Sequence, residues 1–303
     1  MCSSDLLDAA ARAGANPVFT IEPGYPAALA AIDAPPPLLY IKGQSALLQR
    51  PAIAIVGSRQ CSAAGAKVAA MFAHSLGTSG YVIASGLARG IDGAAHTASL
   101  ATGTVAVLAG GIDILYPPEH ANLYDRIAEQ GCLVTELPPG YKPRGQDFPR
   151  RNRIISGISL GVVIVEAAAR SGTLVTARYA GEQGRDVFAV PGHPLDPRAE
   201  GTNRLIKNGA TLVTEADDVM RVLEPLSGLR DGATQLRWQP REPEPVDQLP
   251  PVVGDAERDV VLTALGPAPI DLDAIQLATG LTARAIQIAL MELDLAGHIT
   301  RPG

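Results

Sequence analysis

The chain has 303 residues, with 31 Asp and Glu against 25 Lys and Arg and a net charge of −6 at pH 7. This balance argues against a uniformly cationic, histone-like binder of nucleic acid, but not against a local basic site, because the field near a ligand matters more than the sum. Hydrophobic residues make up 47% and aromatic residues 4%, which excludes a disordered chain and favours an α/β core rich in Ala, Val and Ile.

The cysteines and the apolar runs indicate the compartment. Cys2, Cys61 and Cys132 are widely spaced and form no CxxC pair, which argues against a disulfide framework or a zinc site and fits a reducing environment. The longest apolar runs, such as residues 161–169, have the length of a strand and contain Glu166, so we expect no membrane span. The first ten residues lack the basic region of a signal peptide. We therefore expect a cytoplasmic protein.

Residues 1–50 are predicted to be an N-terminal extension. The run Pro35–Pro37 breaks any helix, and the following PLLYIKG, residues 37–43, is predicted to be an edge strand that leads into the core.

Short runs of Val, Ile, Leu and Ala alternate with helix-like stretches from about residue 52 to 224. They are apolar on both faces, which is typical of parallel strands buried between two layers of helices. The runs are AIAIVGS (52–58), YVIASG (81–86), TVAVLAGG (104–111), GVVIVEA (161–167) and DVFAVPG (186–192), with CLVTEL and TLVTEA as shorter candidates. This alternation predicts an α/β domain over residues 51–224, with a Rossmann-like, doubly wound and mostly parallel sheet.

The C-terminal part divides into a linker and a small domain. Residues 225–254 contain six prolines among charges, which predicts an extended linker in which Trp238 makes at most a minor docking contact. Residues 255–303 contain three helical patterns and a strand-like HITRPG, which predicts a winged helix-turn-helix domain. Its net charge is −4 and its expected recognition helix offers phosphates only Arg284. We therefore favour a protein contact over duplex binding for this domain.

The first strand ends in VGSRQCSAAG. Gly57 and Ser58 at a strand–helix turn are expected to leave amide groups for a phosphate, and Arg59 adds a guanidinium. The pattern is not GxGxxG, and no acidic residue ends the second strand, so dinucleotide binding is disfavoured. The alternative is a packing turn with an exposed arginine.

Two further strand ends carry polar residues. Asp92 and His96 lie four residues apart on one helix face, where capping and a structural role are favoured over acid–base catalysis. Ser171, Gly172 and Thr173 open a helix and offer hydroxyl and amide groups to a phosphate, with a simple helix cap as the alternative. No catalytic triad or metal-ligand cluster completes a mechanism, so we expect neither metal nor cofactor.

The segment YKPRGQDFPRRNR has a net charge of +4 and lies between two predicted strands, at the carboxyl edge of the sheet. A basic surface with an aromatic side chain is typical of proteins that bind single strands without sequence preference. Phe148 would stack on the face of a base. A duplex hides the faces of its bases, so a single strand is the expected ligand. The cations expected to reach phosphates are Lys142, Arg144, Arg150, Arg151 and Arg153. The alternative is a solvated basic loop that Phe148 anchors to the core.

Several stretches in the same order resemble the DNA-processing protein A (DprA/Smf) family. They are VGSR, SGLARGIDGAAH, TVAVLAGGIDILYP, FPRRNRIISG, VVIVEAAARSGTLVTARYAGEQGRDVFAVPG and GTNRLIKNGATLV. The resemblance covers about residues 25–224, and the C-terminal segment is similar to the winged-helix domain of some members.

This resemblance implies a homodimeric protein without catalytic activity that binds and protects single-stranded DNA in a pocket of its Rossmann-like domain. It further implies loading of the recombinase RecA onto that DNA during natural transformation and recombination. By position, Gly57, Ser58 and Arg59 match the family's phosphate-binding turn. The family's FPxRNR stretch is matched by Phe148, Arg151, Asn152 and Arg153.

The chain departs from the family at three places. Ala64 stands where members often have an aromatic residue, and TELPP stands where they have SE-aromatic-P. Gly145 replaces a basic residue before FPxRNR, which leaves Arg144 or Lys142 to substitute for it.

Two other functions remain open. Glu166 and the following SGT are loosely similar to the nucleoside-monophosphate phosphoribohydrolases, although in those enzymes the glutamate follows the glycine-rich turn. The C-terminal domain could instead make the protein a duplex-binding regulator, against which its negative charge argues.

Overall fold

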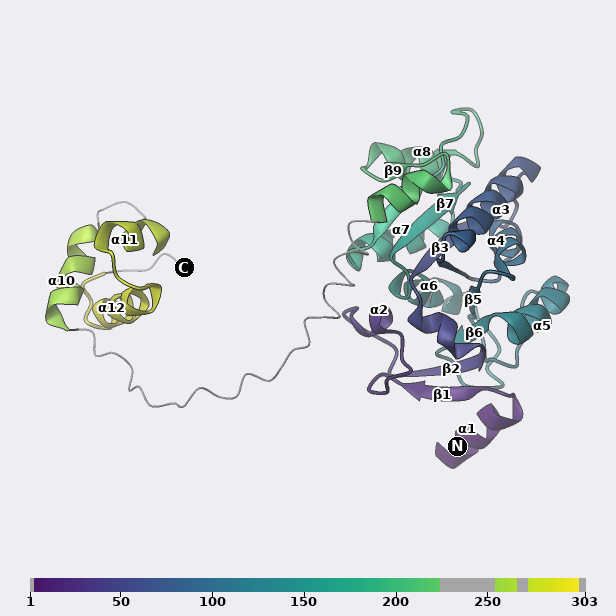
Figure 1. Cartoon of the computed structure of the whole chain (residues 1–303), viewed down its shortest axis with the longest axis horizontal. Coiled ribbons are helices and arrows are strands. Elements are labelled where there is room, and N and C mark those ends of the chain that lie inside the picture. The colour runs from purple at the N-terminus through teal and green to yellow at the C-terminus, as the bar shows by residue number, and fades with distance from the viewer. Residues whose placement is uncertain (1–2, 224–253, 266–271, 300–303) are drawn as a thin grey trace. The chain divides into compact units, whose positions relative to one another are not determined.

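The computed structural model describes residues 3–223, 254–265 and 272–299. The chain divides into two compact units, Met1–Gln235 and Leu236–Gly303 (Figure 1). The predicted linker, with Trp238, lies outside the described residues except for Gly254, and so do the last four residues of the predicted strand HITRPG.

The first unit is built on one nine-stranded sheet with the order β1-β2-β6-β5-β4-β3-β7-β8-β9. All seven predicted strands of the domain are present, and each pairs in parallel with its neighbours among them. They are β3 (Ala52–Gly57), β4 (Val82–Ser85), β5 (Thr104–Val107), β6 (Cys132–Thr135), β7 (Gly161–Val165), β8 (Asp186–Ala189) and β9 (Thr211–Leu212). The predicted fold class is confirmed, because these strands are buried between helices on both faces.

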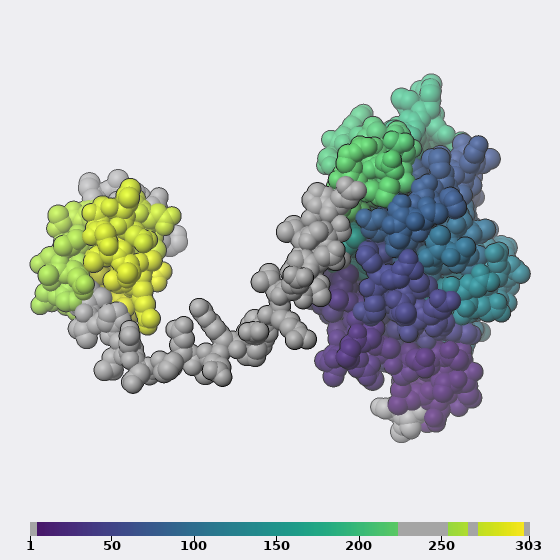
Figure 2. Space-filling view, viewed as in Figure 1, coloured from purple at the N-terminus to yellow at the C-terminus, as the bar shows by residue number. Residues whose placement is uncertain are grey.

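The N-terminal segment belongs to the same sheet. Strand β1 (Asn16–Phe19) pairs antiparallel with β2 (Leu38–Gly43), which pairs antiparallel with β6. The prediction that PLLYIKG is an edge strand is therefore wrong, because β2 has neighbours on both sides and β1 forms the edge. The N-terminal residues also pack against the rest of the unit Met1–Gln235 (Figure 2). Three short helices complete this segment: α1 (Ser3–Arg12), α2 (Ala27–Ala30) and η1 (Ser45–Gln49).

Helices cover both faces of the sheet. On one face α2, α6 (Asp147–Gly157), α7 (Thr173–Glu182) and α8 (Glu200–Lys207) pack against a core that includes Val56, Ala84 and Ile164. On the other face lie α3 (Ala63–Thr78), α4 (Ile91–Ser99), α5 (Ala121–Gln130) and a helix at residues 216–223. The turn η2 (Pro118–His120) leads into α5. This two-sided arrangement is the doubly wound fold (Figure 1).

The strand order reverses between β3 and β7. From β3 the chain continues outward through β4, β5 and β6, whereas β7, β8 and β9 extend the sheet in the opposite direction. In open α/β sheets, ligands bind outside the carboxyl ends of the strands at such a switch point. The residues that follow β3, β4, β5 and β7 are therefore the candidates for a site.

The second unit contains the three predicted helices, α10 (Asp255–Ala264), α11 (Leu272–Thr279) and α12 (Ala283–Leu295). Their buried residues form one small core of Val261, Ile275, Ile286, Ala289 and Leu293. Within the described ranges, no single helix is long and apolar enough to cross a membrane. Only α11 and α12 together meet that test, as a pair bent by 107°.

Candidate functional site

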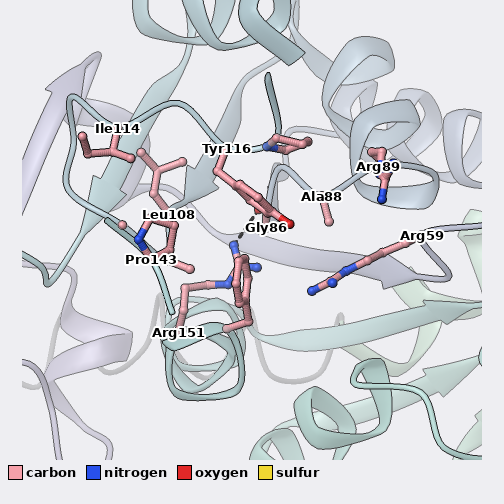
Figure 3. Close-up of a pocket in the computed structure, with 13 residues that line it drawn as sticks. Arg59, Gly86, Ala88, Arg89, Leu108, Ile114, Tyr116, Pro143 and Arg151 are labelled. Carbon is pink, nitrogen blue, oxygen red and sulfur yellow. Dashed lines mark hydrogen bonds between the residues drawn. The ribbon is translucent and has the colours of Figure 1, made fainter. Parts of the chain in front are cut away.

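A pocket opens at the carboxyl ends of β3, β4 and β5, beside the first turns of α6 (Figure 3). Three arginines line it, namely Arg59, Arg89 and Arg151, together with the rings of Tyr116 and Phe148. Among the described residues, neither a carboxylate nor an imidazole contributes to the lining. The enclosed volume of about 30 Å³ has room for one or two water molecules. A larger ligand must therefore bind at the open mouth.

The mouth of the pocket carries two aromatic rings and a cation. The ring centres of Tyr116 and Phe148 are 5.2 Å apart with planes tilted by 55°, and the guanidinium carbon of Arg59 lies 5.2 Å from the centre of the Phe148 ring. Phe148 is half-buried and Tyr116 is 47% exposed, so neither ring is sealed in the core. Rings at a solvent-accessible mouth offer faces on which a planar base can stack, and Arg59 adds a positive charge.

Arg151 lies at the back of the pocket, and its predicted contact with a phosphate stays a prediction. It is 6% exposed, and its Nη1 donates hydrogen bonds to the carbonyls of Gly86 and Val107, at the ends of β4 and β5. Burial lowers the pKa of Arg151 to about 10, while the negative charge of Asp92 acts in the opposite direction. The guanidinium group therefore links two strand ends at the back of the pocket and presents its positive charge from there.

Side chains bind the backbone of the loop after β4 at Gly86, Leu87 and Ala88. The Asp92 carboxylate accepts from the amides of Gly86 and Ala88, and His96 Nε2 accepts from the Leu87 amide. His120 Nδ1 donates to the Leu87 carbonyl at 3.1 Å. Leu87 has a φ of +56°, a conformation that non-glycine residues rarely adopt. These bonds hold the loop in a strained shape that positions Arg89 and Arg151.

This geometry agrees with a structural role of Asp92 and His96, which the sequence favours over acid–base catalysis. Both are buried, and His96 Nδ1 lies 2.7 Å from the Thr104 hydroxyl. Burial raises the pKa of the Asp92 carboxyl and lowers the pKa of His96 to about 3. His96 is therefore a neutral imidazole that donates through Nδ1 and accepts through Nε2.

Arg150 and Arg153 do not face the pocket arginines. Both bind the carboxylate of Glu136, which follows β6: the distance is 3.0 Å from Arg150 Nε and 2.5 Å from Arg153 Nη2. Arg153 also donates to the Ala34 carbonyl at 2.6 Å. The side chain of Glu136 is only 8% exposed, so its negative charge is balanced by these two arginines. In this structure Arg150 and Arg153 thus share one carboxylate, and their contact with phosphates stays a prediction.

The remaining cations of the basic segment are exposed. Lys142 and Arg144 lie in the loop before α6, where the Arg144 guanidinium is 5.9 Å from the centre of the Tyr141 ring. The Arg144 amide donates to the Asp147 carboxylate at 2.7 Å, which fixes this loop to the start of α6. Asn152 lies on the next turn, and its Nδ2 is 3.4 Å from the Gly172 carbonyl.

The start of α7 lies beside the turn that follows β3. Thr173 donates its hydroxyl to the Gly57 carbonyl at 2.9 Å, and the Ser171 hydroxyl accepts from the Thr173 amide at 3.2 Å. The Thr173 hydroxyl proton is thus used within the fold, whereas the Ser171 hydroxyl accepts here and can still donate to a phosphate. Gly172 faces open space, because a Cβ there would meet nothing within 4 Å. Gly57, Ser58 and Ser171–Thr173 therefore form one continuous edge beside Arg59.

Sequence reasoning missed three residues of this site. Tyr116 follows β5 in the stretch GGIDILYP, and Arg89 lies in SGLARG after β4. Both positions follow strands at the carboxyl edge, which was the available signal. Glu136 had none, because it contacts arginines 14 and 17 residues further along the chain. In the described part of the chain, no group of three or more His, Cys, Asp or Glu is placed to hold a metal ion.

A doubly wound sheet with a pocket at its strand ends defines the class: a Rossmann-like α/β protein whose pocket is lined by arginines and aromatic rings. Comparison with known families makes this specific. Residues 16–224 match the family described as DNA recombination-mediator protein A, and residues 240–303 match the DprA winged helix domain. The chain belongs to this family.

Relatives and solved structures agree with this assignment. The chain is 42% identical to Protein Smf of Escherichia coli over 91% of its own length and 72% of the relative's. It is 45% identical to DNA processing protein DprA of Streptococcus pneumoniae over 69% and 74%. The crystal structure of the latter protein has a TM-score of 0.69 and covers 73% of this chain and 78% of its own.

One solved structure bears directly on the ligand of a relative. It describes the single-stranded DNA binding mode of DNA processing protein A from Helicobacter pylori. That protein is 27% identical to this chain, with a TM-score of 0.64, and the match covers 72% of this chain and 96% of the other.

Proposed function

We propose that the protein binds single-stranded DNA, without catalysis, at the pocket formed by β3, β4, β5 and α6. The observation that carries the proposal is the cluster of Arg59, Tyr116 and Phe148 at the pocket mouth. Two ring faces beside a guanidinium group provide base stacking and phosphate attraction in one place, which is how sequence-tolerant single-strand binders work. In a duplex the base faces are stacked on one another, so a single strand is the better ligand.

The other residues of the predicted site support several contacts along a DNA strand rather than a single contact at the pocket. Lys142 and Arg144 are exposed on one side of the pocket. On the other side, Gly57, Ser58 and the open start of α7 at Gly172 continue the edge. The solved relative from Helicobacter pylori supports this ligand class.

The chemistry of the pocket supports binding without turnover. Hydrolysis of a nucleotide needs a positioned acid or base, and the described pocket lining offers arginines, aromatic rings and apolar groups instead. Asp92 and His96 are buried and bonded to backbone amides. Glu166, the residue on which a phosphoribohydrolase reaction would depend, binds Ser62 outside the pocket lining.

The wider role follows from the family. We infer that the protein acts as a homodimer that protects incoming single-stranded DNA and loads the recombinase RecA onto it during natural transformation. The family description as a recombination mediator and the relatives named as DNA processing proteins support this role.

The test compares equilibrium binding of single and double strands of equal length across salt concentrations. Arg59→Glu is expected to weaken single-strand binding and to reduce the slope of log K against log salt by about 0.7, because one phosphate contact is lost. Arg178→Glu, on the exposed surface of α7, makes the same charge change away from the pocket and serves as the control. Equal effects of the two variants, with folding intact, would falsify the proposal.

Dimerisation and loading are measured separately. Light scattering should give twice the 31.4 kDa mass of the chain, and the protein should shorten the lag of RecA filament formation on single-stranded DNA. A monomer that leaves the lag unchanged would limit the function to DNA binding.

A further inference from the structure

The crevice between β3 and β7 is occupied by a side chain of the protein itself. In Rossmann-like proteins a phosphate group binds here, at the start of the helix that follows the first strand of the fold. In this chain that helix is α3, and its N-cap is Ser62. The Glu166 carboxylate, which follows β7, accepts hydrogen bonds from the Ser62 amide at 2.9 Å and from the Ser62 hydroxyl at 2.5 Å. An internal anion thus lies where a ligand phosphate would lie.

The backbone of α3 leaves room for this carboxylate. A Cβ on Gly65 would lie 2.6 Å from the carboxylate carbon of Glu166, so the first turn of α3 touches the carboxylate with bare backbone. The Gly65 amide donates to the Ser62 hydroxyl at 2.9 Å, which completes the cap. The contact is so close that a phosphate can bind here only if the side chain of residue 166 moves away, which a neutral amide does more readily than a carboxylate held by charge-assisted hydrogen bonds.

The backbone at Glu166 is strained. Its φ is +55°, in the left-handed region that a non-glycine residue adopts only where the surroundings enforce it. The strain directs the side chain back across the crevice toward α3 instead of along the continuation of β7. Such strain is concentrated at functional positions, which indicates more than a helix cap.

The electrostatics of the crevice oppose a second anion. The nearby Cys61 thiol has a raised pKa, first because of burial and second because of the Glu166 charge. A phosphate at the same place would meet the same repulsion. The neighbouring guanidinium of Arg198 binds the Asp196 carboxylate at 2.9 Å and so brings little net positive charge.

We propose that Glu166 is a specificity-determining residue, whose carboxylate replaces a nucleotide phosphate at the start of α3 and excludes mononucleotides and dinucleotides from the switch point. This exclusion does not depend on the proposed function. Its consequence for nucleic acid does rest on that function: a polynucleotide is held by several weaker phosphate contacts at the pocket and beside Gly172 at the start of α7, so free cellular nucleotides do not compete with it.

The test removes the charge and keeps the shape. In Glu166→Gln, the amide oxygen can still accept from the Ser62 amide and the amide nitrogen can donate to the Ser62 hydroxyl. The probes are inorganic phosphate and AMP, with the Ser62 and Ala63 amide resonances as the readout. We expect the variant to bind both probes at least about tenfold more tightly than the wild type, as removal of one like charge allows. Glu182→Gln, an exposed change of the same charge on α7, should leave both affinities unchanged.

Two further measurements keep the inference testable if the variant is unstable. In the wild type, phosphate should not shift the Ser62 and Ala63 amides, and a saturable shift there would overturn the inference. Ser62→Ala keeps the carboxylate and should gain no phosphate affinity, so a gain would show that the cap rather than the charge closes the site. A folded Glu166→Gln with wild-type phosphate affinity would also overturn it. If Glu166→Gln binds phosphate but neither protein binds single-stranded DNA, the proposed function fails and this inference stands.

Discussion

The guanidinium group of Arg151 lies directly against Gly86. Its Nη1 donates to the Gly86 carbonyl at 2.6 Å, and a Cβ at position 86 would lie 2.5 Å from the same nitrogen and 2.6 Å from Cζ. The absence of a side chain at Gly86 therefore allows a buried cation to join the ends of β4 and β5 beneath the pocket. A residue that the sequence marks as a phosphate ligand acts in the structure as part of the pocket wall.

Gly86→Ala should displace Arg151. The added methyl group cannot be accommodated without moving a buried guanidinium, so we expect a loss of about 1–3 kcal/mol in the free energy of unfolding, as for other overpacked sites. Urea unfolding measures the change. Gly181→Ala is the matched control, because that glycine lies in α7 with nothing within 4 Å and should gain stability from its better helix propensity. Equal effects at the two positions would contradict the proposed contact.

Glu136→Ala should destabilise the protein far more than Arg150→Ala. The first change leaves the guanidinium of Arg153, whose side chain is 17% exposed, without its carboxylate, which we expect to cost about 3 kcal/mol. The second removes a side chain that is 58% exposed and should cost less than about 1 kcal/mol. Urea unfolding measures the free energy of unfolding of both variants. A smaller loss for Glu136→Ala than for Arg150→Ala would show that the ion pair between Glu136 and Arg153 does not hold α6.

The parallel strands could be predicted because burial on both faces leaves a continuous apolar run, as in AIAIVG of β3. Strand β1 could not, because it has four residues, is half-exposed, and contains Pro17, which reads as a break. Without β1, the sequence predicts β2 as the edge strand. The sequence places Arg59 and Phe148 separately at the carboxyl edge of the sheet, one after β3 and the other between β6 and β7. Their contact at the pocket mouth is visible only in the structure.

The directions of the arginines on α6 were harder to predict. Arg150, Arg151 and Arg153 form one basic cluster in the sequence, but an α-helix turns by about 100° per residue, so Arg151 points away from Arg150 and Arg153, which share one side of the helix. Arg151 enters the pocket wall, whereas the other two reach Glu136. That carboxylate comes from a different strand end, and no local pattern predicts the contact.

Both rings at the pocket mouth should contribute to DNA binding if the proposed function is right. Phe148→Ala and Tyr116→Ala are each expected to weaken single-strand binding by about 1–3 kcal/mol while leaving the salt slope unchanged, because stacking releases no counterions. Tyr116→Phe should bind as the wild type does, since only the ring face is used. Fluorescence titrations at several salt concentrations test this, and a changed slope in the alanine variants would point to a lost phosphate contact instead.

The buried His96 should make the protein acid-sensitive. Its pKa falls from 6.5 to about 3 on folding, chiefly through burial, so below pH 6.5 the unfolded chain binds a proton that the folded chain does not. Its stabilising contribution is therefore complete above pH 6.5 and is lost as the pH falls, by about 1.4 kcal/mol per pH unit until about pH 3. His96→Gln retains an acceptor for the Leu87 amide but does not titrate. Its unfolding free energy, measured in urea between pH 7 and pH 5, should fall less steeply with acid than that of the wild type. Parallel curves would show that His96 binds its proton equally in the folded and unfolded states.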